Sequence, residues 1–143
     1  MTTSLGMEVR LEVPFAAALA RTREALKAEG FGVLTEIDMQ AAFKDKLGRA
    51  FRPYFILGAC NPPLAHRALS ADPEIGLLLP CNVTVEAGDT GGAVVRLVDP
   101  ERLMAAGALA DSDELALVAK DAGVRLRRVA MALGEGFVEP PPP

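Results

Sequence analysis

The chain has 143 residues, of which 50% are hydrophobic and 24% charged, and its formal net charge is −4. This length and composition are typical of one globular domain, and the acidic balance with scattered arginines argues against a nucleic-acid-binding face. The N-terminus has no secretory pattern, and no apolar run approaches the ~20 residues that span a membrane. We therefore expect a cytoplasmic protein with neither nucleic acid nor membrane as partner, in which its two cysteines form no structural disulfide.

The first half of the chain alternates strand and helix patterns. Residues 7–13 place apolar and charged side chains in strict alternation, which is typical of a strand with one buried face. Pro14 fits the first turn of a helix that ends at Gly30, and Asp38 is the expected N-cap of a shorter helix that Gly48 ends. The expected elements are a strand at 7–13, a helix at 14–29, a strand at 31–37, a helix at 38–47 and a strand at 54–60.

The second half begins with a helix that Asn61 caps and that ends by Asp72 and Pro73. The apolar run Ile75–Leu79 is interpreted as the start of a strand that bends at Pro80 and resumes at residues 83–85. A hairpin turn at 89–92 leads into a strand at 93–98, followed by a short helix at 99–104. Asp111 or Ser112 is expected to cap a long last helix with a continuous apolar stripe.

These elements predict a single compact α+β domain over residues 1–138. We expect about five strands in one main mixed or antiparallel sheet, with helices packed on it and a long C-terminal helix. Residues 139–143 are Glu139 and four prolines, which predict a mobile tail.

Both cysteines lie where an apolar run ends in Cys-Asn beside proline, at 58–63 and at 78–82. Cys60 directly precedes an expected helix N-terminus, where the helix dipole would lower a thiol pKa or attract an anion. Packing as a small buried residue is the plain alternative. Cys81 shares a strand face with Val83, so it is expected to point to the core and Asn82 away from it. If the strands are neighbours, the two thiols are inert, form a redox pair or supply half of a metal site.

Other catalytic and cofactor patterns are absent from the sequence. His66, the only histidine, fits no metal-ligand spacing and is expected on a helix surface. No serine has a nucleophile elbow around it, and the glycines at 88–92 lack the lysine and helix of a phosphate loop. We therefore predict no cofactor and no metal, and favour a role other than that of an enzyme.

The segments Tyr54–Ala65 and Asp72–Val83 resemble the bacterial and archaeal family called domain of unknown function 302. Residues 30–33 and 36–38 fit the same family, and the resemblance covers roughly residues 7 to 135. It implies a compact α+β domain and a homodimer, and it implies no activity. The resemblance also implies that five residues are candidates for lining a pocket: Cys60, Asn61, Pro62, Pro80 and Cys81.

The favoured function is a dimeric binding module whose strand ends line a pocket for a small ligand, with an anion among the candidates. The expected ligand-binding residues are Cys60, Asn61, Pro62, Pro80, Cys81 and Asn82. The alternative is a thiol redox or metal-handling protein that uses Cys60 and Cys81. A third interpretation is an assembly factor that acts through its dimer surface, for which the long C-terminal helix is the expected element.

Overall fold

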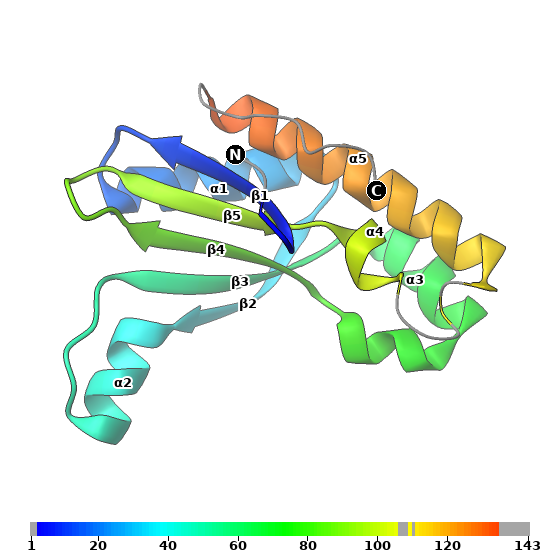
Figure 1. The fold of residues 1–143 in the computed structure, drawn as a ribbon, viewed down its shortest axis with the longest axis horizontal. Coiled ribbons are helices and arrows are strands. Elements are labelled where there is room, and N and C mark those ends of the chain that lie inside the picture. The colour runs from blue at the N-terminus through cyan, green and yellow to red at the C-terminus, as the bar shows by residue number, and fades with distance from the viewer. Residues whose placement is uncertain (1–2, 106–108, 110, 135–143) are drawn as a thin grey trace.

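Five antiparallel strands form one sheet in the order β1-β5-β4-β3-β2, with helices on one of its faces (Figure 1). The computed structural model describes residues 3–105, 109 and 111–134. The strands are β1 (Gly6–Leu11), β2 (Gly32–Asp38), β3 (Tyr54–Cys60), β4 (Cys81–Ala87) and β5 (Ala93–Val98). The helices are α1 (Phe15–Ala28), α2 (Met39–Leu47), α3 (Pro62–Ala71), the 3-10 helix η1 (Pro73–Leu78), α4 (Pro100–Leu103) and α5 (Asp113–Leu133). The predicted α+β fold and long C-terminal helix are confirmed, and the sheet is purely antiparallel; the predicted tail at 139–143 lies outside the described residues.

The main hydrophobic core lies between the sheet and the helices α1 and α5. Alternate strand residues such as Val9, Leu57 and Val83 are fully buried there against Leu26 of α1 and Leu126 of α5. Full burial of each such side chain contributes about 1.5–3 kcal/mol relative to leaving it exposed. The alternation predicted for residues 7–13 therefore marks the face of β1 that carries the core.

A second hydrophobic cluster lies beyond the end of the sheet, among α3, η1, α4 and the N-terminal half of α5. Its buried members include Leu64 of α3, Ile75 of η1 and Leu115 of α5. The C-terminal half of α5 packs in the main core, so this helix connects the two clusters.

Side-chain caps fix where the helices begin. Asp38 Oδ1 accepts a hydrogen bond from Ala41 N at 3.0 Å, and Asn61 Oδ1 accepts one from Leu64 N at 3.3 Å. Ser112, one of the two predicted caps of α5, accepts from the backbone N–H of Leu115. These caps satisfy N–H groups that have no partner inside the helix, and the predicted starts of α2 and α3 are confirmed.

The strand predicted over Ile75–Leu79 is wrong, because residues 75–78 belong to η1 and Leu79 follows its end. The Asp72 carboxylate accepts a hydrogen bond from Glu74 N at 2.9 Å, and Pro73 occupies the first helical position. With three residues per turn, η1 buries Ile75 in the second cluster and leaves Leu77 81% exposed. The strand begins only at Cys81, after a cis Leu79–Pro80 peptide bond.

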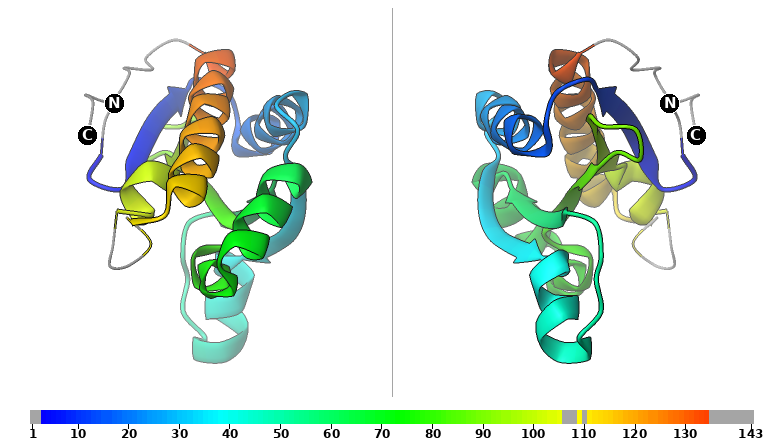
Figure 2. Two further views of the ribbon diagram at one scale, coloured as in Figure 1. Left: turned by 90° about the vertical axis from the view of Figure 1, so that its right-hand side faces the viewer. Right: turned by 90° about the vertical axis from the view of Figure 1, so that its left-hand side faces the viewer.

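The opposite face of the sheet is covered by none of the described helices, and it carries a charged network. Arg96 of β5 contacts the carboxylates of both Glu8 and Glu86, with Nη2 of Arg96 3.0 Å from Oε1 of Glu8. Both glutamates are more than nine-tenths buried although they lie on the uncovered face. At the far end of the sheet, α2 projects away from the rest of the molecule (Figure 2).

Candidate functional site

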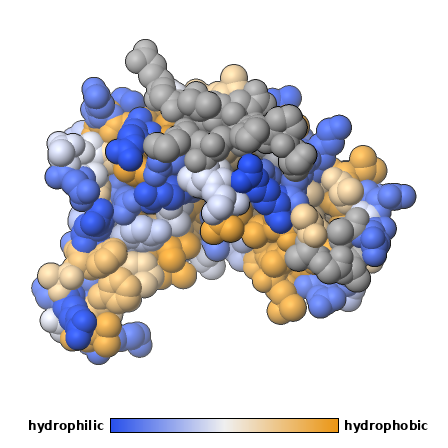
Figure 3. All heavy atoms as spheres, in the orientation of Figure 1, coloured by the Kyte–Doolittle hydropathy of each residue, from blue (hydrophilic) through white to orange (hydrophobic). Residues whose placement is uncertain are grey.

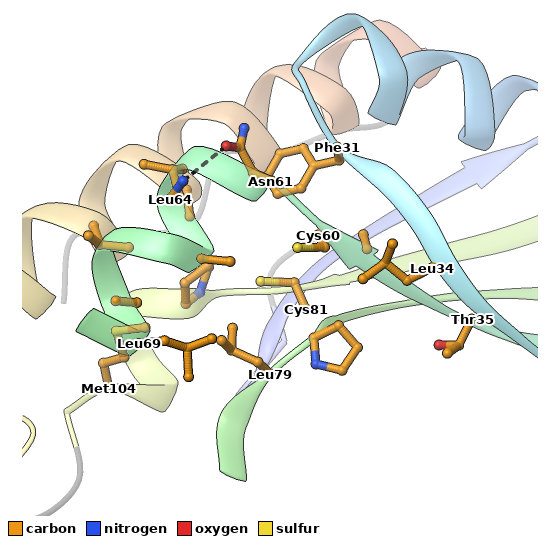
Figure 4. Close-up of a pocket in the computed structure, with 17 residues that line it drawn as sticks. Phe31, Leu34, Thr35, Cys60, Asn61, Leu64, Leu69, Leu79, Cys81 and Met104 are labelled. Atoms are coloured by element: carbon orange, nitrogen blue, oxygen red, sulfur yellow. Dashed lines mark hydrogen bonds between the residues drawn. The ribbon is translucent and has the colours of Figure 1, made fainter. Parts of the chain in front are cut away.

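A cavity of about 300 Å³ lies between the two hydrophobic clusters, where β3 ends and β4 begins (Figure 4). One wall is formed by the end of β3, the start of β4 and the edge strand β2. The other walls come from α3, α5 and the segment around α4. The lining consists of Phe31, Leu34, Thr35, Ala59, Cys60, Asn61, Leu64, Ala65, Ala68, Leu69, Leu79, Pro80, Cys81, Pro100, Met104, Val118 and Ala122. None of these side chains is charged.

The two cysteines meet at this cavity because β3 and β4 are neighbours. Cys81 on β4 is paired with Ala59 on β3, and Cys60 is the next residue along β3. Both sulfur atoms lie at the cavity in Figure 4. Both cysteines are free thiols. Burial, reinforced by the nearby Cys60, raises the pKa of Cys81 to about 11. Cys81 is therefore protonated at neutral pH and lines the cavity as an apolar group.

Alkylation kinetics test this protonation state. Because the pKa of Cys81 is about 11 instead of 9.0, about 100-fold less thiolate is present at neutral pH than in an ordinary cysteine. The rate of carbamidomethylation at Cys81, followed by mass spectrometry, should rise about tenfold per pH unit from about pH 7 to about pH 10 without a plateau. The urea-unfolded chain is the control, and its rate should begin to level off near about pH 9. A plateau below that pH in the folded protein contradicts the assignment.

Asn61 has a structural task at the edge of the cavity. Its side chain caps α3, as described above, and its Nδ2 donates to the backbone carbonyl of Glu29 at 3.4 Å. The same carbonyl accepts a second hydrogen bond from Nη1 of Arg125, at 3.1 Å. Asn61 therefore connects the start of α3 to the end of α1 and, through the carbonyl that it shares with Arg125, to α5. Both the oxygen and the nitrogen of its side-chain amide already have hydrogen-bond partners.

Gly58 permits the close packing beside the cavity. A Cβ atom at this position would lie 2.8 Å from Cγ of Pro80 and would also collide with the hydroxyl of Thr35. Both of these residues line the cavity. The absence of a side chain at Gly58 thus lets β2 and the segment before β4 approach β3 closely.

The structure brings together four of the six site residues expected from the sequence: Cys60, Asn61, Pro80 and Cys81. The other two, Pro62 and Asn82, are exposed and do not line the cavity. Asn82 points away from the core, as the alternation of β4 predicts. His66 is also exposed and lies outside the lining. Whether the four lining residues bind a ligand stays a prediction.

Sequence reasoning missed most of the cavity, because its other walls come from distant segments. Ala65 and Ala68 on α3 face Val118 and Ala122 on α5, and Met104 follows α4. The inward stripe of α3 was predictable from its spacing, and the small size of its alanines is the one local signal that space remains there.

Metal-binding clusters and membrane spans are both absent from the part of the chain that the structure describes. No group of three or more His, Cys, Asp or Glu side chains could hold a metal ion there. No helix among the same residues is long and apolar enough to cross a membrane.

Comparisons with known proteins agree on one family. The sequence model of the family described as "Domain of unknown function DUF302" matches residues 7–133, whereas no curated protein matches the chain. Among solved structures, the chain is similar to the "uncharacterized conserved protein DUF302 from Bacillus stearothermophilus". The two are 28% identical with a TM-score of 0.77, and the match covers 89% of this chain and 96% of that one. The chain therefore belongs to the DUF302 family, as its Cys-Asn segments indicate.

Proposed function

We propose that this protein is a dimeric cytoplasmic binding module that takes a small, neutral and largely apolar molecule into the cavity between its two hydrophobic clusters. The observation that carries the proposal is the lining: seventeen side chains surround about 300 Å³ of space and none is charged. Cavities that bind small molecules begin at about this size and are predominantly apolar with a few polar groups. Two free cysteines in one cavity suit a reducing compartment.

The lining favours a neutral ligand over the anion considered from the sequence. Leu64 N, one of the N–H groups at the start of α3, is already bonded to Asn61, and no lysine or arginine side chain lines the cavity. Moving an anion from water into such surroundings without a counter-charge costs several kcal/mol. The polar groups of the lining are the hydroxyl of Thr35, the two thiols and the amide of Asn61, and the amide is already bonded.

The approach to the cavity is also apolar. Leu34 on the edge strand β2 is 67% exposed and Leu69 on α3 is 43% exposed, and both belong to the lining. Large apolar side chains that remain in water beside an apolar cavity are typical of the entrance to a ligand site. A ligand that reaches the cavity would remove this surface from water as well.

A thermal-shift comparison of neutral and anionic probes tests the proposal. Toluene and indole should raise the melting temperature, whereas benzoate, of similar size, should not. A probe at 100 times its dissociation constant adds about 2.7 kcal/mol to the free energy of unfolding. Neutral probes that leave the melting temperature unchanged, or a stronger effect of benzoate, contradict the proposal.

A variant that fills the cavity adds a second test. Ala68 is buried and lines the cavity, so the ring of Ala68→Phe should occupy the space and abolish the shift caused by toluene. Ala71→Phe is the matched control, because Ala71 is exposed on the same helix and does not line the cavity. The control should keep the shift of the unchanged protein. Retention of the shift in Ala68→Phe argues that toluene binds elsewhere.

The alternative function in thiol chemistry rests on Cys60 and Cys81 sharing one cavity. Thiol exchange and metal binding need a thiolate, and the raised pKa of Cys81 opposes its formation. The uncharged cavity therefore supports binding of a neutral molecule better. The alkylation experiment described above, followed at Cys60 as well as at Cys81, separates the two functions, because thiol chemistry requires at least one of them to react readily in the folded protein.

A further inference from the structure

The helix α2 lacks the packing that a helix of its length needs. It has nine residues and none of them is buried, while isolated helices shorter than about 12 residues are marginal in water. Its support is its contact with β3, its Asp38 cap and two contacts with Phe51. Nε2 of Gln40 donates to the carbonyl of Phe51 at 2.9 Å, and the rings of Phe43 and Phe51 lie edge to face with their centroids 5.0 Å apart. Apolar side chains nevertheless remain in water: Leu47 is 63% exposed and Phe51 43%.

A second lobe, formed by α3 and η1, lies across a hollow from α2 (Figure 3). We call residues 37–51 the α2 lobe and residues 62–79 the α3–η1 lobe. Apolar side chains are exposed on the second lobe too, with Leu77 81% and Leu69 43% exposed. Figure 3 shows apolar surface on both sides of the hollow.

The two lobes carry opposite charges. The α2 lobe exposes Lys44, Lys46 and Arg49 and holds two carboxylates, that of Asp45 and that of Asp38, which caps α2, so its net charge is positive. The α3–η1 lobe carries the carboxylates of Asp72 and Glu74, and its Arg67 is already paired with Glu114 of α5 at 3.0 Å. Within the described residues, none of the three cations and neither of the two carboxylates has an ion-pair partner.

We propose that the hollow is the interface of a two-fold symmetric dimer, in which the α2 lobe of each copy packs against the α3–η1 lobe of the other. In such an interface one patch contacts a different patch twice, so a cationic apolar lobe and an anionic apolar lobe on the same chain complement each other in both halves. The partner supplies the burial that α2 lacks. This inference deepens the dimeric part of the proposed function, and its α3–η1 lobe shares Leu69 with the entrance of the cavity.

The exposed face of α5 is the competing surface. Its large exposed apolar residues are Leu117, at 56%, and Met131, at 63%. They lie about four turns apart on one helix, and single apolar side chains are normal on the surface of a monomer. Among the described residues, α2 is the helix without a buried side chain, and it is not part of this surface, so the exposed face of α5 gives less reason to expect a partner than the hollow does.

Sedimentation velocity tests the assignment with a matched pair of variants. The unchanged protein should sediment as a dimer of the 15.1 kDa chain. Leu47→Glu places a charge in the proposed interface and should raise the dissociation constant of the dimer at least about 30-fold. Leu117→Glu places the same charge on α5 and should leave the dimer intact. A monomeric unchanged protein, or a dimer that Leu117→Glu disrupts and Leu47→Glu does not, overturns the assignment.

Charge reversal tests the pairing of the lobes. Lys46→Glu and Glu74→Lys should each weaken the dimer, and the double variant should bind more tightly than either single variant, because opposite charges again face each other. Circular dichroism checks that each variant is folded. Double-variant binding weaker than both single variants overturns the pairing of these lobes.

The toluene shift, measured on the same variants, keeps the two proposals apart. Neither Leu47 nor Lys46 lines the cavity, so a monomeric Leu47→Glu variant should still bind toluene. Loss of the dimer with toluene binding retained supports the interface, while a dimer that binds no neutral probe contradicts only the ligand proposal.

Discussion

Replacing Arg96 with methionine should lower the free energy of unfolding by about 2–3 kcal/mol, because Arg96 is the cation that contacts both Glu8 and Glu86. Glu86 would keep only its longer contact with Arg52, whose Nη1 lies 3.7 Å from Oε2 of Glu86. Removing one partner of a buried ion pair costs about 3–5 kcal/mol, and the partial exposure of Arg96, at 41% of its side chain, reduces that figure. Methionine keeps the apolar part of the side chain in place. Urea unfolding followed by circular dichroism measures the change.

The electrostatics of Arg96 give the physical reason for so large an effect. Burial opposes its charge, but the hydrogen bond from Arg96 to Glu86 and the charges of Glu86 and Glu8 outweigh it, and the pKa of the guanidinium is raised. Arg10→Met is the control, since Arg10 is 71% exposed and lies 4.0 Å from Glu8. Exposed pairs contribute about 0–1 kcal/mol. Equal losses in the two variants would contradict the role assigned to Arg96.

Replacing Gly58 with alanine should destabilise the fold by about 2 kcal/mol, because the new methyl group collides with Pro80 and Thr35. The rigid ring of Pro80 cannot turn aside as a flexible side chain would. Since both displaced residues line the cavity, the affinity for toluene should fall as well. Chemical unfolding and the toluene shift measure the two effects.

Gly32→Ala is the matched control for this prediction. A Cβ at Gly32, on the neighbouring strand, would have only the carbonyl oxygen of Cys60 near it, at 4.0 Å. Its effect should lie within about 1 kcal/mol of the unchanged protein and could be stabilising, because alanine restricts the unfolded chain more than glycine does. A Gly58→Ala variant as stable as the Gly32→Ala variant would show that the segment around Pro80 has room to move.

Local chemistry made most of the fold predictable. The alternation at residues 7–13, the caps Asp38 and Asn61 and the left-handed Gly48 after α2 act within a few residues of themselves. Such signals depend on backbone hydrogen bonds and on which dihedral angles a residue tolerates. They determine where helices and strands end, whatever residues pack against these elements across the core.

The wrong prediction at Ile75–Leu79 shows where local reasoning fails. A wholly apolar run of five residues fits a buried strand and a short helix equally well. The decisive signal was Asp72 followed by Pro73, which begins η1. The sequence interpretation used that pair only to end the preceding helix.

The cavity was predictable only in part, because its walls are assembled by tertiary packing. The Cys-Asn segments indicated the strand ends, and four of their residues line the cavity. Apart from the small side chains of Ala68 and Ala122, nothing local shows that α3 and α5 leave space between them. The lining carries no charged side chain, which favours a neutral ligand, and this is evident only once the walls are assembled.

The position of the cavity beside the middle of α5 affects how the protein unfolds locally. Residues 115–122 of α5 belong to the second cluster and residues 126–133 to the main core, so the cavity lies at the boundary between two cores that one helix joins. Missing contacts at such a boundary lower the cost of opening α3 and η1 separately from the sheet, in a partial unfolding that exchanges their amide hydrogens early. A molecule held in the cavity would touch both cores at once and make them open together. Occupancy would therefore slow amide exchange across α3 and also across η1, whose residues do not line the cavity.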